Sequence, residues 1–354
     1  MRALFVSGSS GGHLTPLVAV ERALKKLSPK AQTHFLCSSK REDAEYLEHE
    51  GVAFTQSPRP KKNIFFPVTY LAAKRVARKT LKRFQPDVIF SKGGAVSVPL
   101  LRAAKKKGIP YVIHESDSVM GKANRMVAKD AAAICLGFPP SDEQRMFGVE
   151  PVVTGNPIRP EVTKGSRARG LKLTNLTGRK PVLLVMGGSQ GAEALNEAVL
   201  MHIDKLLTFC DVVHLTGPGK TNAGRRAGYW FKPFVYEELP DLYAIADIAV
   251  SRAGASSIAE LGANKIPMIL VPIRGLANDH QFENAVRAER EGAAIMLPQN
   301  HLDRDLSDAV KHLLENREKK TQMSTSALRL AHPEAARHIA KILLECVAKR
   351  KKSH

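Results

Sequence analysis

Two short glycine-rich segments hold the residues best suited to bind a phosphate. The first, Gly8–His13, reads Gly-Ser-Ser-Gly-Gly-His, and the second, Gly187–Gly191, reads Gly-Gly-Ser-Gln-Gly. Each follows a short apolar run and opens a helix-like stretch. A glycine turn between a strand and a helix lets backbone N–H groups approach a phosphate, and the helix N-terminus adds partial positive charge. The sequence therefore predicts two nucleotide-binding halves in tandem, with a cleft between them.

Two side chains have the chemistry of catalysis or of sugar binding. His13 stands at a predicted helix start, where the helix dipole favours the neutral imidazole that a general base needs. A capping or packing histidine is the alternative. Glu260 has a carboxylate that can accept hydrogen bonds from both hydroxyls of a ribose, and the alternative is back-bonding to Ser257 in a capping box.

The segments around these turns alternate between strand and helix patterns, which is typical of parallel sheets with crossover helices. In the first half we expect strands at 3–6, 33–37, 88–90, 110–113 and 132–136, and helices at 16–27, 42–50, 70–84, 98–107 and 119–129. In the second half we expect strands at 182–186, 211–215, 232–235, 247–251 and 267–271, and helices at 192–207, 240–246, 257–263, 279–291 and 303–315. The predicted fold class is α/β, with two facing Rossmann-like domains.

A turn-rich segment, Val152–Pro160, marks the expected domain boundary. We expect an N-terminal domain over residues 1–159 and a C-terminal domain over residues 160–332. The polar, basic segment 161–180 connects them. The last segment, 333–354, is predicted to form a helix from Pro333 to about Lys349 followed by a basic tail, and we expect it to return to the first domain.

Basic residues are in excess and unevenly placed. The chain has 54 Lys and Arg against 34 Asp and Glu, a net charge of +20, and residues 1–159 hold 26 of the basic against 13 of the acidic residues. Between Glu50 and Asp87 there are nine basic residues and no acidic one. Such a surface attracts an anionic partner.

An amphipathic helix is predicted inside this basic window. Apolar residues recur with helical spacing from Ala73 to Phe84, so the basic residues fall on the opposite face. The residues predicted to meet a membrane are Ile64, Phe65, Phe66, Lys74, Arg75, Arg78 and Lys79. An ordinary solvated helix face is the alternative. Because no nucleic-acid-binding motif accompanies the charge, we favour an anionic membrane surface over nucleic acid.

Other classes of protein fit the sequence less well. The sequence predicts neither a signal peptide nor a membrane-spanning segment of about 18 apolar residues, so we expect a cytoplasmic protein. Neither glycine turn reads Gly-x-Gly-x-x-Gly, although Ser38–Arg41 leaves an NADP enzyme as a weak alternative. Asp303-Arg-Asp305 has the form of a metal-binding pair, but its place at a predicted helix start favours N-capping. We therefore predict no metal and no cofactor.

Seven short motifs stand in a fixed order along the chain. They are Gly-Gly-His, Lys-Gly-Gly-x-Val-Ser, His-Glu-Ser-Asp, Gly-Asn-Pro-x-Arg, Gly-Gly-Ser-Gln-Gly-Ala, Ser-Arg-Ala-Gly-Ala-x-Ser-x-x-Glu and Asp-His-Gln-x-x-Asn-Ala. Each motif is weak alone, but in this order over about residues 5–345 they resemble the MurG family of peptidoglycan N-acetylglucosaminyltransferases. The resemblance implies a GT-B glycosyltransferase that acts at the cytoplasmic face of the plasma membrane as a peripheral protein.

The same resemblance implies a reaction and a place for each substrate. GlcNAc would move from UDP-GlcNAc to the C4 hydroxyl of MurNAc in undecaprenyl-pyrophosphoryl-MurNAc-pentapeptide, with inversion at the anomeric carbon. The C-terminal domain would hold the donor through Ser189, Tyr236, Ala255, Ser256, Ser257, Ile258, Ala259, Glu260, His280 and Gln281. Further substrate contacts are implied for Ser10, Gly11, Gly12, Asp117 and Arg159. Amides at a helix N-terminus would stabilise the leaving diphosphate without a metal.

The N-terminal domain is implied to hold the lipid-linked acceptor. The residues implied to contact its diphosphate are Gly93, Gly94 and Ser97. His13 is the first choice for the general base, and Glu115 is the second choice or the partner that orients the acceptor. The chain departs from the family at Ala95, where an aromatic residue is common, and at Ser116-Asp117, where Gln-Asn is common.

Two alternative functions stay open at this point. One is a related UDP-sugar transferase that acts on another lipid, such as a diacylglycerol. The other is a non-catalytic UDP-sugar-binding membrane protein. The donor domain would look alike in all three proteins, so the sequence separates them poorly.

Overall fold

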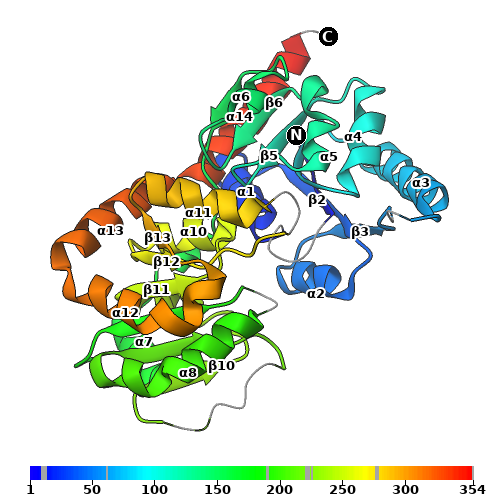
Figure 1. The fold of residues 1–354 in the computed structure, drawn as a ribbon. Helices are drawn as coiled ribbons and strands as arrows, with labels where there is room; N and C mark the ends of the chain where they lie inside the picture. The colour runs from blue at the N-terminus through cyan, green and yellow to red at the C-terminus, as the bar shows by residue number, and fades with distance from the viewer. Residues whose placement is uncertain are drawn as a thin grey trace. The chain divides into compact units, whose positions relative to one another are not determined.

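The chain forms two compact α/β units (Figure 1). The computed structural model describes residues 1–8, 14–60, 63–188, 191–219, 224, 226–275 and 279–352. The first unit comprises residues 1–159 and 334–354, and the second comprises residues 160–333.

The first unit is built on a seven-stranded parallel sheet with the strand order β3-β2-β1-β4-β5-β6-β7. The strands are β1 (Arg2–Gly8), β2 (Gln32–Ser38), β3 (Phe54–Ser57), β4 (Val88–Gly94), β5 (Tyr111–Glu115), β6 (Ala133–Leu136) and β7 (Pro151–Val153). Phe5, Phe90 and Ile113 in the central strands are fully buried. Such continuous apolar runs are expected where helices cover both faces of a sheet.

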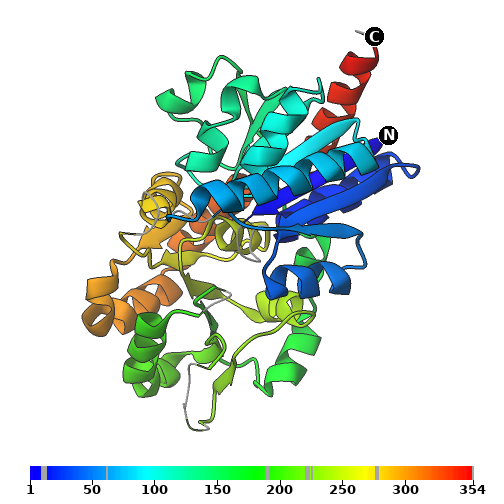
Figure 2. The same ribbon diagram turned by 90° about the vertical axis from the view of Figure 1, so that its right-hand side faces the viewer.

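Helices cover both faces of this sheet (Figure 2). One face packs against α1 (Leu14–Leu27), α2 (Arg41–His49) and α14 (Ala335–Lys352). The other packs against α3 (Phe66–Phe84), α4 (Ser97–Lys105) and the short α5 (Lys122–Arg125). The short α6 (Asp142–Arg145) precedes β7. Although α14 ends the chain, Ile339 and Leu343 place it in the core of the first unit.

The second unit is built on a six-stranded parallel sheet with the order β10-β9-β8-β11-β12-β13. The strands are β8 (Val182–Met186), β9 (Asp211–Leu215), β10 (Tyr229–Lys232), β11 (Ile248–Ser251), β12 (Met268–Leu270) and β13 (Ala294–Met296). The helices are α7 (Arg167–Thr174), α8 (Glu193–Phe209), α9 (Leu239–Ile245), α10 (Ala255–Ala263), α11 (His280–Arg290), α12 (Leu302–Glu315) and α13 (Arg317–Ala331). Helices α8 and α12 pack on one face of the sheet, around Leu195, Ile203 and Leu306.

Both sheets have the strand order of a doubly wound Rossmann fold. Numbered within its own unit, each sheet runs 3-2-1-4-5-6, and the first unit adds a seventh strand. The order reverses between β1 and β4 in the first unit and between β8 and β11 in the second. Ligands of open α/β sheets bind at the carboxyl ends of strands at such a switch point. The predicted α/β class with two Rossmann-like units is confirmed.

Several predicted elements are wrong in their limits. The helix expected at 119–129 is only α5 followed by a 3-10 turn, Ala128–Asp130. The strand expected near 232–235 is β10, which ends at Lys232 because Pro233 has no N–H for the ladder. The segment 161–180 is not merely a connection, since it contains α7.

Other elements were absent from the prediction. These are β3, β7, β13, the short α6 and α13. The three strands are short edge strands, and α13 has a narrow buried stripe, Met323, Ala327 and Ala331. That stripe suffices because α13 packs closely on α10, where a Cβ at Gly262 would lie 2.5 Å from the carbonyl oxygen of Ala327.

Candidate active site

The acceptor residues predicted in the first unit lie at the carboxyl ends of β4 and β5. Strand β1 is the neighbour of β4, and Gly8 at its end pairs with Gly94. On the other side of β4, Ser91 pairs with Ile113 of β5. The chain therefore leaves β1 beside the Gly93-Gly94 pair, at the switch point of the sheet.

Five predicted site residues lie outside the described part of the chain. They are Ser10, Gly11, Gly12, His13 and Ser189. Their roles stay predictions made from the sequence.

The end of β4 has a backbone that favours glycine. Gly93 and Gly94 have φ of 80° and 87°, in the left-handed region. A Cβ at Gly93 would lie 2.9 Å from Oδ1 of Asn124. Ser97 is buried, and its hydroxyl donates to the carbonyl oxygen of Gly94 at 2.7 Å. Because that hydroxyl has only one hydrogen to donate, Ser97 holds the turn while the glycine backbone remains the predicted contact for a diphosphate.

Glu115, at the end of β5, is buried and bound by three N–H donors. Its Oε2 accepts from the backbone N of Gly121 at 2.8 Å and from Nδ2 of Asn124 at 2.9 Å. Its Oε1 accepts from the backbone N of Asp117 at 3.3 Å. Burial raises the pKa of Glu115, the Asp117 charge adds to this, and the three hydrogen bonds oppose it. The carboxylate therefore fixes the loop that follows β5.

A buried lysine beside Glu115 was not singled out from the sequence. Lys92 lies in β4, and its Nζ is 2.9 Å from Nδ1 of His114 and also hydrogen-bonds to Oγ of Ser116. The sequence offers a signal for a buried lysine, because Lys92 lies two residues after the apolar run 88–90. Asp117 and Arg159, two further predicted substrate contacts, are partly buried. Arg159 is the last residue of the first unit before the second begins.

In the second unit the predicted donor residues follow β8, β11 and β12. Ser251 at the end of β11 pairs with Met186 of β8 and with Leu270 of β12. After β8 the backbone N of Gly191 donates to the carbonyl oxygen of Gly188 at 2.9 Å. Gly191 has φ of 69°, and a Cβ there would lie 2.3 Å from the carbonyl oxygen of Thr216. The turn thus requires glycine at this position.

Helix α10 begins at Ala255, earlier than expected. Its N-cap is Gly254, which has no side chain to cap the first amides. Ser256 and Ser257 lie in the first turn, so the capping-box interpretation of Ser257 and Glu260 is wrong. Glu260 is partly buried, and its Oε2 accepts from the hydroxyl of Tyr243 at 2.8 Å. Ile258 and Ala259 are buried on the core side of the helix.

Polar side chains hold the loops around α10 in place. Nδ2 of the buried Asn284 donates to the carbonyl oxygen of Ala253 at 3.1 Å, and NH1 of Arg252 donates to that of Val271 at 3.1 Å. Burial lowers the pKa of Arg252. Both residues belong to motifs recognised in the sequence, although neither was singled out there.

The remaining predicted donor residues lie in two loops. Oε1 of Gln281 accepts from the backbone N of Ile273 at 3.3 Å, which holds the loop after β12. His280 is the first residue of α11. Tyr236 follows β10, and its backbone N donates to Oε2 of Glu238 at 3.3 Å. The contacts of these residues with a substrate stay predictions.

Internal contacts occupy one possible site for another ligand. At the end of β2, Oγ of Ser38 donates to Oδ2 of Asp43 at 2.5 Å, and Arg41 pairs with Glu45 at 2.6 Å, which disfavours an NADP phosphate there. Within the described part of the chain, no group of three or more His, Cys, Asp or Glu side chains is arranged to hold a metal ion.

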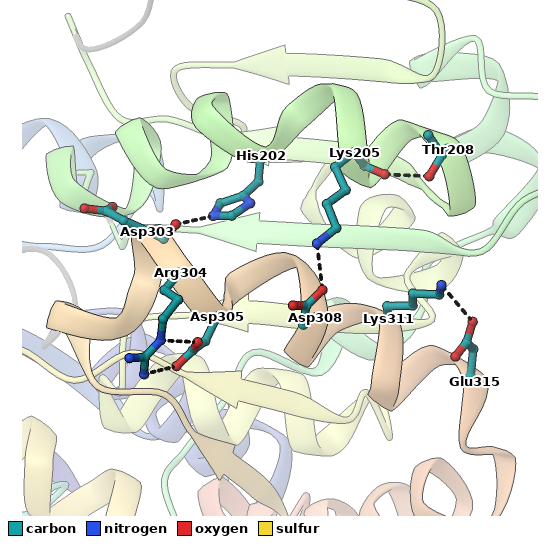
Figure 3. A network of polar contacts seen from close by, with 9 residues as sticks. All are labelled: His202, Lys205, Thr208, Asp303, Arg304, Asp305, Asp308, Lys311 and Glu315. Atoms are coloured by element: carbon teal, nitrogen blue, oxygen red, sulfur yellow. Dashed lines mark hydrogen bonds and ion pairs between the residues drawn. The ribbon is translucent and has the colours of Figure 1, made fainter.

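The Asp303–Asp305 pair belongs to a surface network of polar contacts (Figure 3). Asp305 pairs with Arg304 at 2.7 and 2.9 Å, and the carbonyl oxygen of Asp303 lies 3.0 Å from Nε2 of His202. Helix α12 begins at Leu302 with His301 as its N-cap, so N-capping by Asp303 is wrong. Both carboxylates lie instead in the first turn, where the helix dipole favours them.

An exposed apolar cluster precedes and begins α3. Ile64, Phe65 and Phe66 are 86, 59 and 46% exposed. Helix α3 buries Ala73, Ala77, Thr80 and Leu81 and turns its basic residues outward. A groove of about 360 Å³ between α3 and α4 has five basic residues in its wall: Lys74, Arg78, Arg102, Lys106 and Lys107. In the part of the chain that the structure describes, no helix is both long and apolar enough to span a membrane.

Comparison with known proteins gives the class of protein first. Residues 3–136 match the glycosyltransferase family 28 N-terminal domain, and residues 182–340 match its C-terminal domain. The crystal structure of Acinetobacter baumannii MurG shares the fold, with a TM-score of 0.75 and 23% identity over 97% of this chain and 99% of that one. Two Rossmann-type units with these matches define a glycosyltransferase of family 28.

Two curated relatives identify the family more closely. Proteins of Clostridium botulinum (strain Loch Maree / Type A3) and Lachnoclostridium phytofermentans are 35 and 37% identical to the chain. Each match covers 89% of this chain, and 92 and 91% of the relatives. Both are named UDP-N-acetylglucosamine–N-acetylmuramyl-(pentapeptide) pyrophosphoryl-undecaprenol N-acetylglucosamine transferase. The chain belongs to this family of transferases, the MurG family.

Proposed function

We propose that the protein transfers GlcNAc from UDP-GlcNAc to the C4 hydroxyl of MurNAc in undecaprenyl-pyrophosphoryl-MurNAc-pentapeptide, with inversion at the anomeric carbon. The product is the lipid-linked disaccharide precursor of peptidoglycan. The observation that carries this proposal is the match to transferases of that name over 89% of the chain. The two Rossmann-type switch points support it, because each offers a binding edge for one substrate.

The second unit is proposed to bind the donor. The first amides of α10 would receive the diphosphate, where the helix dipole also favours negative charge. Glu260 would accept hydrogen bonds from the ribose hydroxyls. The hydroxyl of Tyr243 donates to Oε2 of Glu260 at 2.8 Å and orients the carboxylate.

The first unit is proposed to bind the acceptor and to start the reaction. His13 accepts the proton of the C4 hydroxyl, and the oxygen attacks C1 of GlcNAc. The bond from C1 to the UDP oxygen breaks, and UDP leaves with that electron pair. The amides of α10 stabilise the charge that develops on the diphosphate. A single displacement of this kind inverts C1, and the proton on His13 later passes to solvent.

Glu115 is proposed to orient the acceptor site, with His13 as the base. Glu115 is 6% exposed, and its carboxylate already accepts three N–H hydrogen bonds from its own loop. A general base must reach the hydroxyl that it deprotonates, usually within about 3 Å. A group engaged in this way is better suited to hold the loop than to accept a proton from the substrate.

The exposed cluster Ile64–Phe66 with the basic face of α3 is proposed to hold the protein on the cytoplasmic face of the plasma membrane. Apolar side chains at a membrane boundary add buried area, and each Lys or Arg near an anionic surface adds about 1 kcal/mol. The lipid-linked acceptor would then be reached from the surface in which its lipid chain is anchored.

The test is release of UDP from UDP-GlcNAc with and without a short-chain lipid-linked MurNAc-pentapeptide. We expect release that depends on the acceptor and stops when its C4 hydroxyl is replaced by hydrogen. Release only with a different lipid, such as a diacylglycerol, would favour the related transferase. Tight UDP-GlcNAc binding without turnover on any acceptor would favour a non-catalytic binding protein.

A further inference from the structure

Lys92 has its charged group fully inside the first unit. The residue is 3% exposed, on β4, directly before Gly93 and Gly94. A buried ammonium is costly unless partners replace its water. Here the partners are His114 and Ser116, which lie on either side of Glu115.

The hydrogen bonds of Lys92 continue to Gly155 and Asn156, which lie shortly before the chain enters the second unit. An ammonium only donates, so Nδ1 of His114 accepts and the ring hydrogen is on Nε2. That Nε2 lies 2.9 Å from the carbonyl oxygen of Gly155 and donates to it. The carbonyl oxygen of Ser116 accepts from Nδ2 of Asn156 at 3.0 Å. Two parallel routes therefore join Lys92 to Gly155-Asn156.

This arrangement holds Glu115 from both sides. The ammonium of Lys92 hydrogen-bonds to the residues before and after Glu115. The Glu115 carboxylate accepts hydrogen bonds from Gly121 and Asn124. Nδ2 of Asn124 also lies 3.1 Å from the carbonyl oxygen of His114. The backbone of Glu115 thus has little freedom, and its position depends on one buried cation.

We infer that Lys92 is a positioning residue for the transfer reaction, whose buried ammonium fixes Glu115 and ties the acceptor turn after β4 to Gly155-Asn156. This inference rests on the proposed function, in which Glu115 orients the acceptor. Lys92 touches neither substrate and acts through Glu115 and the glycine turn.

The charges around Lys92 predict the direction in which the pKa of Glu115 changes when Lys92 is replaced. Burial lowers the pKa of Lys92 to about 8, while the carboxylates of Glu115 and Asp117 and the thiol of Cys135 act in the opposite direction. Among the described residues, His114 is a further titratable group in contact with it. An ammonium at this position favours the ionised form of Glu115. Removing this cation raises the pKa of Glu115.

A carboxyl titration by ¹³C NMR tests this without relying on activity. In protein labelled at glutamate carboxyls, Lys92→Met is expected to raise the pKa of Glu115 by about one unit or more. Ser116→Ala is the matched control, because it removes one partner and keeps the charge, and it should leave that pKa nearly unchanged. If Lys92→Met does not fold, Lys92→Gln replaces it, since it also lacks the charge. An unchanged Glu115 pKa in the charge-free variant would overturn the inference.

Steady-state kinetics provides a second test of the role of Lys92. Lys92→Met is expected to lower kcat by on the order of 10- to 100-fold and to move the acid limb of the kcat/KM profile to higher pH, with UDP affinity unchanged. Full kcat with an unmoved acid limb would also overturn the inference. If the wild-type protein transfers no GlcNAc at all, the proposed function fails, and the NMR titration still decides whether Lys92 sets the charge of Glu115.

Discussion

The two sheets share a strand order, but the polar groups at the carboxyl ends of their strands are held differently. After β4 and β5 the first unit has buried side chains bonded to one another, with Lys92 and Glu115 at the centre. After β8 and β11 the second unit has a glycine turn and a helix whose N-cap, Gly254, has no side chain. A diphosphate is well received by backbone amides, whereas attack by a hydroxyl needs oriented side chains. The contrast supports assigning the donor to the second unit and the acceptor to the first.

The largest effect is expected at the predicted base. His13→Ala should lower kcat by about 10²–10⁴. It should leave UDP affinity nearly unchanged, because His13 belongs to the first unit and the proposed UDP-binding residues belong to the second. Steady-state kinetics with calorimetry of UDP binding measures both. Glu115→Gln is the comparison variant. If it abolished turnover while His13→Ala kept most of it, the roles assigned to these residues would be reversed.

Charge reversal on α3 should give the next largest effect. Changing Lys74, Arg75, Arg78 and Lys79 to Glu should remove sedimentation with anionic vesicles, because each charge is worth about 1 kcal/mol near such a surface. High salt should weaken wild-type binding in the same direction. Turnover of a short-chain, water-soluble acceptor should survive the reversal.

A matched reversal elsewhere separates a specific surface from total charge. The control residues are Lys311, Arg317, Lys319 and Lys320 on α12 and α13 of the second unit. These changes should leave vesicle binding largely intact. Equal loss of binding in both variants would show that net charge, and not the face of α3, attracts the vesicles.

A buried histidine in the second unit offers a contrast with His114. Nδ1 of His214 lies 3.0 Å from the hydroxyl of Tyr229, and Nε2 lies 3.0 Å from Oδ1 of Asn196. Burial lowers the pKa of His214 to about 4. The unfolded chain protonates this histidine below about pH 6.5, so its contribution to stability is intact above that pH. It is lost as the pH falls toward 4, by up to on the order of 3 kcal/mol.

Urea unfolding at pH 7 and pH 4.5 measures this contribution. His214→Gln keeps a polar side chain without a group that titrates there, and its free energy of unfolding should fall less between the two pH values. Acid sensitivity from other groups is common to both proteins and cancels in the comparison. An equal fall in both proteins would remove His214 from the explanation.

The smallest effect is expected for the ribose contact. Glu260→Ala should weaken UDP binding by roughly 1–3 kcal/mol, because ribose hydroxyls lose a charged partner. Tyr243→Phe, which removes only the bond that orients Glu260, should have a smaller effect in the same direction. Calorimetry without added divalent metal gives both values. A requirement for magnesium, or full affinity in Glu260→Ala, would count against this donor site.

Sequence patterns predicted the strands near the centre of each sheet and missed three of the four edge strands. Val182–Met186 was predicted with the limits that β8 has, because a continuous apolar run marks a strand buried on both faces. β3, with the sequence Phe-Thr-Gln-Ser, lacks such a run. The helix expected at 119–129 begins only at Lys122, because the backbone N of Gly121 donates to Glu115.

The candidate site shows the same limit. Motifs located Glu115, Glu260 and the glycine turns, because turns and strand ends leave marks in local sequence. The bonds among Lys92, His114 and Asn156 join residues far apart in the chain, and only the sheet order brings them together. No local pattern predicts such pairing.

The proposed reaction transfers one sugar to one hydroxyl of a lipid-linked acceptor. The most direct measurement is mass spectrometry and proton NMR of the product formed from UDP-GlcNAc and a short-chain lipid-linked MurNAc-pentapeptide. We expect one added N-acetylhexosamine, linked to C4 of MurNAc, with an anomeric configuration opposite to that in the donor. A product with retained configuration, GlcNAc on another hydroxyl, or UDP release without any glycosylated lipid would contradict it.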